Sequence, residues 1–289
     1  MTPRTVILTA VAMMAFAANS LLCRAALGAG LIDAASFASV RVMSGAVVLF
    51  VILAVRDRRP VLPKADWRMV VTLFLYVAFF SFAYIWLSAG TGALLLFGAV
   101  QLTMFAVALY GGERFTALSW AGFAAALLGL VWLVAPGVTA PDPLGAALMV
   151  VAGIAWGIYS LLGRGTSDPL AATAGNFLYA VPLVLYVSHL FWWNLNLSAE
   201  GVALAVVSGA LASGCGYVIW YAALRGLTAT RAATVQLSVP AIAALGGVLF
   251  MAEDVTLRLV VASAATIGGV AVVLSQRAGR EAHRQGQDS

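Results

Sequence analysis

The chain has 289 residues, of which 63% are hydrophobic and 9% charged, with a formal net charge of +5. A soluble domain is about 45–50% apolar and about 25% charged, so this composition excludes a water-soluble fold and requires lipid around the chain. A positive charge can favour nucleic-acid binding, but here the basic residues gather at the ends of apolar segments, so we expect no nucleic-acid partner.

Ten apolar segments of roughly 20 residues each are predicted to cross the membrane as helices. They lie at about 5–28, 33–55, 68–89, 92–111, 117–135, 143–163, 170–192, 200–224, 230–251 and 256–275. These segments nearly fill the chain and leave no room for a soluble domain. The predicted fold class is therefore an all-α integral membrane protein with ten transmembrane helices.

The basic residues predict how these helices are oriented. If both termini lie on one side of the membrane, that side holds nearly all of the arginines and the lysine, and the other side holds only Arg24 and Arg258. Positively charged loops face the cytoplasm, so we expect both termini there. The expected location is the inner (plasma) membrane of a bacterial-type cell.

An internal repeat divides the chain into two halves. Leu109–Glu113 (LYGGE) is echoed 140 residues later by Leu249–Glu253 (LFMAE). At the same offset Gly129 matches Gly269, and four residues of the first segment have counterparts: Phe16, Ser20, Leu22 and Arg24 match Trp156, Ser160, Leu162 and Arg164. The first segment therefore belongs to the mature fold and is not a cleaved signal peptide.

We predict repeats over residues 1–139 and 140–276, followed by a polar cytoplasmic tail over 277–289. Because five spans is an odd number, the second half enters the membrane from the opposite side, and the halves are inverted repeats. Inverted repeats around a site near the midplane are typical of secondary transporters that work by alternating access. The alternatives are a non-transporting scaffold built by duplication, or a channel.

The layout of two times five spans resembles the EamA-type family of the drug/metabolite transporter superfamily. Pro240–Glu253 (PAIAALGGVLFMAE) is similar to that family's stretch at the end of the ninth helix, and Gly268-Gly269-Val270 fits the tenth. The resemblance implies a central cavity surrounded by helices one to four and six to nine. It also implies export of a small amphipathic metabolite, such as an amino acid or a related compound. The first half has Val100 where the second has Pro240, so a symmetric site is not expected.

Arg41, about eight residues into the second span, is the foremost candidate for substrate binding. Charged side chains inside a membrane are costly and mark functional sites. A guanidinium stays protonated and can bind a carboxylate or a phosphate through two hydrogen bonds. Two alternatives are that Arg41 snorkels to the membrane surface or that it pairs with Asp33.

Other candidates are amide and aromatic side chains within the spans. Amides either bind substrate or join helices, and aromatic rings either contact an amphipathic ligand or pack in the core. The predicted substrate-binding residues besides Arg41 are Asn19, Tyr84, Gln101, Trp156, Tyr159, Trp220 and Gln236.

Three further residues are predicted to serve in gating. Pro240 should break the hydrogen-bond ladder of the ninth span and kink it. Gly153 and Gly157 form a GxxxG pattern that either lets helices approach closely or acts as a hinge.

The acidic residues all lie in loops, in the tail or near helix ends. A proton relay through the membrane centre is therefore disfavoured, and a facilitator, an exchanger or coupling through Glu113 or Glu253 fits better. The sequence has no nucleophile–base pair, metal motif or nucleotide-binding loop, so no enzyme activity, metal or cofactor is expected. The expected partners are a small-molecule substrate and the lipid bilayer, and a homodimer is an alternative to a monomer.

Overall fold

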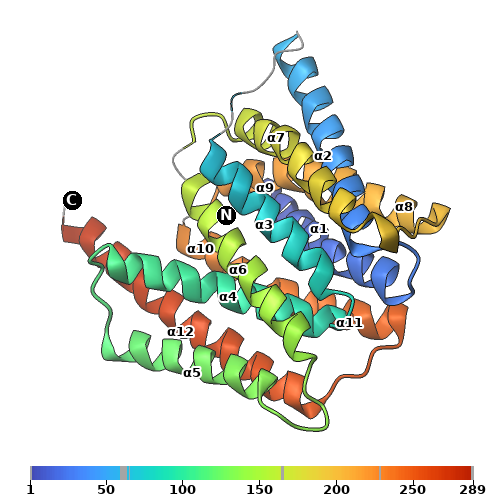
Figure 1. The fold of residues 1–289 in the computed structure, drawn as a ribbon. Coiled ribbons are helices and arrows are strands. Elements are labelled where there is room, and N and C mark those ends of the chain that lie inside the picture. Colours follow the sequence, from blue (N-terminus) through green and yellow to red (C-terminus); the bar gives the residue numbers. More distant parts are fainter. Residues whose placement is uncertain (1, 59–63, 65, 164–165, 228, 288–289) are drawn as a thin grey trace.

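The computed structural model describes residues 2–58, 64, 66–163, 166–227 and 229–287, and nearly all of these residues are helical. The elements are α1 (Pro3–Gly28), α2 (Ala34–Asp57), α3 (Trp67–Ala83), α4 (Ala89–Tyr110), α5 (Ala117–Val134), α6 (Pro143–Gly163), α7 (Pro169–Leu190), η1 (Trp192–Asn194), α8 (Ala199–Val207), η2 (Ser208–Cys215), α9 (Gly216–Leu224), α10 (Ala229–Gln236), α11 (Ser238–Met251) and α12 (Leu257–Gln287). The predicted all-α membrane fold is confirmed. Figure 1 shows the helices as one bundle.

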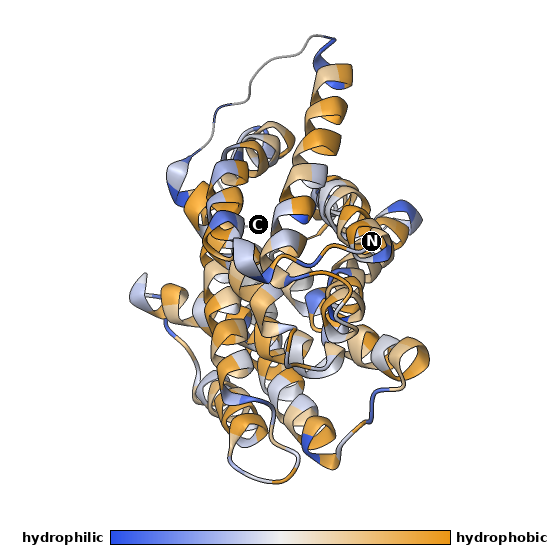
Figure 2. Cartoon of the chain, turned by 45° about the vertical axis from the view of Figure 1, so that its right-hand side comes forward, coloured by the Kyte–Doolittle hydropathy of each residue, from blue (hydrophilic) through white to orange (hydrophobic). Residues whose placement is uncertain are grey.

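Most residues of these helices are apolar, and polar residues gather in the loops and at the helix ends (Figure 2). Within the described part of the chain, nine helical segments are long and apolar enough to cross a membrane, and α3 is a shorter apolar helix. A helix satisfies its own backbone hydrogen bonds, which hydrocarbon requires of any spanning segment. The protein is therefore a multi-pass membrane protein.

Side-chain caps begin many of the helices. Asp33 Oδ1 accepts a hydrogen bond from the Ser36 amide at 2.8 Å, and Asp168 Oδ1 accepts one from the Ala171 amide at 3.1 Å. Such caps satisfy backbone amides that have no partner within the helix. The predicted starts of these helices agree with the observed ones to within a residue or two because the capping residues are readable in the sequence.

Several predicted spans differ from the observed helices, and α12 continues beyond the span at 256–275 to Gln287. The span at 68–89 is too long, because α3 ends at Ala83 and a turn leads to Ser88, which caps α4. The span at 200–224 contains the π-helical segment η2 in its middle. The span at 230–251 is broken at Leu237, where Pro240 has no amide to donate to the carbonyl of Gln236.

Three pairs of helices that correspond in the two predicted repeats pack on each other. α2 packs on α7, α4 on α11, and α5 on α12, and Figure 1 shows α5 and α12 side by side at one edge of the bundle. A Cβ atom at Gly129 would meet the Ala262 carbonyl, and one at Gly269 would meet the Gly122 carbonyl. Gly129 and Gly269 correspond under the offset of 140 residues, and so do Gly122 and Ala262. The two contacts are therefore equivalent, as a two-fold relation between the halves requires. The boundary at 139/140 stays a prediction.

The GxxxG residues of α6 lie against α4. A Cβ atom at Gly153 would lie 2.6 Å from both the Ala99 Cβ and the Leu96 carbonyl oxygen, and one at Gly157 would lie 3.1 Å from the Thr103 Cβ. Small residues are needed here because they let the two helices approach closely. In this structure Gly153 and Gly157 serve close packing, and their role as hinges stays a prediction.

We predict that Gly153→Ala lowers the thermal stability of the purified protein in detergent. The added methyl group must push α6 away from α4, and overpacking of this kind costs about 1–3 kcal/mol. Gly268→Ala is the matched control, because nothing lies within 4 Å of its added Cβ and alanine is the better helix former. Equal melting temperatures for the two variants would contradict this packing.

Candidate functional site

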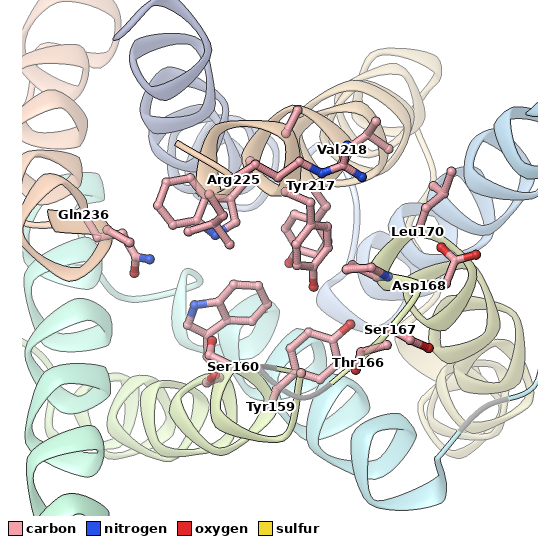
Figure 3. Close-up of a pocket in the computed structure, with 18 of the residues that line it drawn as sticks. Tyr159, Ser160, Thr166, Ser167, Asp168, Leu170, Tyr217, Val218, Arg225 and Gln236 are labelled. Atoms are coloured by element: carbon pink, nitrogen blue, oxygen red, sulfur yellow. Dashed lines mark hydrogen bonds between the residues drawn. The ribbon is translucent and has the colours of Figure 1, made fainter. Parts of the chain in front are cut away.

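A cavity of about 770 Å³ lies between the helices at one end of the bundle. Residues of α2, α4, α6, α7, α9 and α10 line it, and none of its described lining residues comes from α5 or α12. Figure 3 shows Gln236 at one side of this cavity and Asp168 and Leu170 at the other. Lining residues at helix ends, such as Gly163 and Leu224, identify this end as the mouth.

An ion pair joins α2 and α7 at the mouth. Arg56 donates two parallel hydrogen bonds to Asp168, from Nη1 to Oδ1 at 2.8 Å and from Nη2 to Oδ2 at 2.6 Å. These bonds hold the pKa of Asp168 below its usual range. Both side chains are about 40% exposed, so the pair contributes little stability and can open at low cost.

Aromatic rings form the inner wall of the cavity. Trp156 stacks on Tyr159 with ring centroids 5.4 Å apart, and it also contacts Tyr217 at 5.3 Å and Tyr76 at 4.8 Å. We call these four residues the aromatic layer. Because the rings come from α3, α6 and α9, both predicted halves contribute to this layer.

Arg41 lies behind the aromatic layer and is fully buried. Its Nη2 donates to the Tyr76 hydroxyl at 3.0 Å, and its Nε donates to Ser213 Oγ at 3.2 Å. Its Cζ also lies 4.8 Å from the centre of the Phe80 ring. Asp33, the alternative partner, instead caps α2 and accepts a hydrogen bond from the Asn196 amide. Arg41 therefore neither reaches the membrane surface nor pairs with Asp33.

Asn19 belongs to the same polar network. Its Oδ1 accepts hydrogen bonds from Ser208 Oγ at 2.8 Å and from Ser213 Oγ at 3.2 Å. Both serines lie in η2, and π-helical segments occur frequently at functional sites. The network joins α1, η2, α2 and α3 through Asn19, Ser213, Arg41 and Tyr76.

The other predicted substrate residues divide into two groups. Trp156, Tyr159, Trp220 and Gln236 line the cavity. Gln101 and Tyr84 are not among its lining residues: Gln101 donates to the Ala233 carbonyl at 3.4 Å, whereas Tyr84 donates to the Ala89 carbonyl at 3.4 Å. The structure thus brings four of the predicted residues to the cavity and places Asn19 and Arg41 behind it.

At the end of the bundle opposite the mouth, an ionic cluster joins the two halves. Arg24 Nε and Glu253 Oε1 are 3.1 Å apart, and the Ala89 amide donates to Glu253 Oε1 at 3.1 Å and to Oε2 at 2.9 Å. We call these three residues the far-end clamp. Its position follows from α1, because Thr5 packs near Gly226 at the mouth and Arg24 lies roughly 28 Å further along that helix.

The glycine pair in the Pro240–Glu253 stretch makes room for this clamp. A Cβ atom at Gly247 would collide with the carboxylate of Glu253, and one at Gly246 would lie 2.5 Å from Leu21 Cδ1. Ala252 adopts a left-handed conformation with φ 50°, which turns the chain back after α11. The sequence of this stretch therefore positions Glu253 over the end of its own helix, where it meets Arg24.

Comparison with known proteins agrees with this architecture. Residues 143–275 match the model of the EamA-like transporter family. An uncharacterized protein of Pseudomonas aeruginosa is 52% identical over 280 residues, which cover 96% of this chain and 97% of that protein. The chain belongs to the EamA-like transporter family. It is a membrane transporter, and transporters of this family are in general not enzymes.

More distant relatives include other transporters. An uncharacterized transporter of Archaeoglobus fulgidus is 26% identical over 236 residues, which cover 79% of this chain and 83% of the relative. The threonine/homoserine exporter RhtA of Escherichia coli is 31% identical over 159 residues, which cover 52% of each chain. A crystal structure with 20% identity matches 93% of this chain and 97% of its own with a TM-score of 0.64, which shows a shared fold alone.

Among the residues of this EamA-like site that were not predicted from the sequence, two connect its parts. Tyr76 joins the aromatic layer to Arg41, and Ser213 joins Arg41 to Asn19. Tyr76 lies on α3, about two helical turns before the predicted candidate Tyr84, and this spacing was the one available signal. Ser213 stands in a stretch of small residues that is read most simply as a close helix contact.

We predict that Glu253→Gln loosens the far-end clamp and exposes Cys23, the fully buried neighbour of Arg24. In a Cys215→Ser background Cys23 is the one remaining cysteine of the chain. A charge-assisted hydrogen bond contributes about 1.5–3 kcal/mol, so Cys23 should react with a small maleimide at least roughly tenfold faster. Asp254→Asn, at an exposed neighbouring acid, is the control and should leave the rate unchanged. Equal rates in all three proteins would show that the clamp does not hold this end closed.

Proposed function

We propose that this transporter exports a small amphipathic metabolite, such as an amino acid or a related compound, by alternating access between its two repeats. The observation that carries the proposal is the order of three features along the length of the bundle. A cavity lies at one end, the aromatic layer and Arg41 follow behind it, and the far-end clamp joins the halves at the other end. A volume of about 770 Å³ falls within the usual range for small-molecule sites.

The candidate residues divide the recognition of an amphipathic substrate between them. Trp156, Tyr159 and Trp220 supply apolar surface on the cavity wall. Gln236 supplies hydrogen bonds there, and Asn19, Arg41 and Gln101 supply polar and charged groups from the surrounding helices. Tyr84, outside the cavity, holds the start of α4 near the far-end clamp.

Export fits the charges around the mouth. Arg56 and Arg225 line this end of the cavity, and basic residues mark the cytoplasmic side of membrane proteins. The proposed orientation is that of an inner-membrane protein with both termini in the cytoplasm. The cavity then opens to the cytoplasm and takes up substrate from inside the cell. The similarity to a threonine/homoserine exporter over half of the chain supports the same direction.

A channel is the weaker alternative. Conduction needs one continuous open path, whereas here the aromatic layer and the far-end clamp both close the space behind the cavity. Two closures at different depths suit a carrier in which the halves rock against each other. Pro240, at the break between α10 and α11, is the proposed pivot of the ninth span, and Gly153 and Gly157 let α6 move along α4.

Transport into proteoliposomes tests this function. A thermal-shift screen of amino acids, amines, sugars and nucleotides first selects compounds, because a ligand at a hundredfold excess over its dissociation constant stabilises the folded state by about 2.7 kcal/mol. Trp156→Ala should then reduce transport of a selected compound roughly tenfold, since it removes a stacked ring from the cavity wall.

Trp192→Ala is the matched control, because that ring is 65% exposed and lies outside the cavity. It should transport at the wild-type rate. Equal transport by both variants would contradict the assignment of this cavity. Uptake that does not saturate with concentration would favour the channel.

A further inference from the structure

The guanidinium of Arg41 is a buried charge without a counter-ion among the described residues. Ion pairs there join Arg24 to Glu253, Arg56 to Asp57 and to Asp168, and Arg68 to Asp66, and none of them includes Arg41. Arg41 has only neutral partners, the hydroxyls of Tyr76 and Ser213. Burying a charge is costly unless an opposite charge and full hydrogen bonding accompany it.

One nitrogen of Arg41 also lacks a hydrogen-bond partner. Nη1 is buried and donates to no atom of the described residues, whereas Nη2 and Nε each donate to a hydroxyl. Nη1 and Nη2 together form one edge of the guanidinium, and that edge matches the two oxygens of a carboxylate. The partner of Nη2 on this edge, the Tyr76 hydroxyl, is neutral and can be displaced.

The aromatic layer separates this edge from the cavity. Tyr76, which accepts the hydrogen bond from Nη2, packs against Trp156, and Trp156 lines the cavity. Rotation of Tyr76 and Trp156 would therefore expose this edge of the guanidinium to the cavity. Ser213 would remain on Nε and keep the guanidinium tied to Asn19 and η2.

We propose that Arg41 is an inner carboxylate subsite. The carboxylate of the transported molecule bonds Nη1 and takes Nη2 from the Tyr76 hydroxyl, while the apolar part of the molecule stays against the aromatic layer. The substrate class is thus an organic acid or a zwitterion with a free carboxylate and an apolar group. This inference rests on the proposed function, but an exporter of uncharged or cationic compounds would satisfy the proposed function without it.

Binding of paired acids and esters tests the subsite. The probes are threonine, leucine, phenylalanine and benzoate, each as free acid and as methyl ester, with inorganic phosphate as a second anion. The melting temperature of the detergent-purified full chain is measured against the concentration of each probe. At least one free acid should stabilise the wild type, and its ester and phosphate should not.

Three variants separate recognition from packing. Arg41→Lys keeps the charge but loses the paired donors, so acid binding should weaken roughly a hundredfold. Tyr76→Phe removes the hydroxyl that competes for Nη2, so acid binding should become several-fold tighter, whereas a purely structural bond predicts no gain. Arg258→Lys is the matched control, because Arg258 lies over the Trp132 ring but far from the cavity, and it should bind acids like the wild type.

The inference is overturned if no free acid stabilises either the wild type or Tyr76→Phe, if esters stabilise as well as acids, or if phosphate alone does. It is also overturned if Tyr76→Phe weakens acid binding. This second test can be made even if Arg41→Lys does not fold. If the inference is overturned in one of these ways and the wild type still transports esters or amines with saturation, the proposed function stands and only the carboxylate subsite is removed.

Discussion

A permanently charged guanidinium, buried in a bundle that lies in lipid, is the constraint on which the rest of the site depends. Arg41 can occupy this position only if neighbouring helices supply polar groups, and Ser213 and Tyr76 do so from η2 and α3. The π-helical turn of η2 presents both Ser208 and Ser213 to Asn19. The π-helical segment η2 in the eighth span is thus explained by the hydroxyl groups that it supplies to Arg41 and Asn19.

The same constraint fits the proposed alternating access. The hydrogen bonds of Arg41 join elements of both predicted halves, so a relative movement of the halves changes the surroundings of the charge. The aromatic layer covers it from the cavity, and the far-end clamp closes the opposite end with Arg24, Glu253 and the Ala89 amide. In this structure a cavity lies at one end and the far-end clamp joins the halves at the other, an arrangement that suits one stage of a carrier's cycle.

Much of the fold could be predicted from the sequence because lipid imposes simple rules. Apolar segments of about 20 residues mark the spans, and Pro240 marks the break in the ninth. The offset of 140 residues, read from short matches such as Gly129 with Gly269, agrees with the contacts between α5 and α12. The end of α3 was misjudged because Tyr84–Leu87 is apolar and gives no turn signal.

The site was harder to predict because its side chains come together only in three dimensions. Arg41 stood out as a charge inside a span, whereas its partner Tyr76 is one of many aromatic residues. Arg24 looked like an ordinary charge at a helix end and Glu253 was considered for coupling alone. Their pairing across 229 residues follows from the packing of α1 against α11. Tyr84 was predicted as an aromatic residue within the third span, but the early end of α3 places it beside the clamp.

The central claim is that the mouth and the far end open in alternation around Arg41. Pairs of spin labels in a background without Cys23 and Cys215 measure this directly by pulsed electron–electron double resonance, with one pair at Val55 and Arg225 and the other at Ala29 and Asp254. When a transported compound is added, the account predicts populations in which the mouth distance shortens and the far-end distance lengthens. Distances that both stay fixed, or that lengthen together, would contradict it.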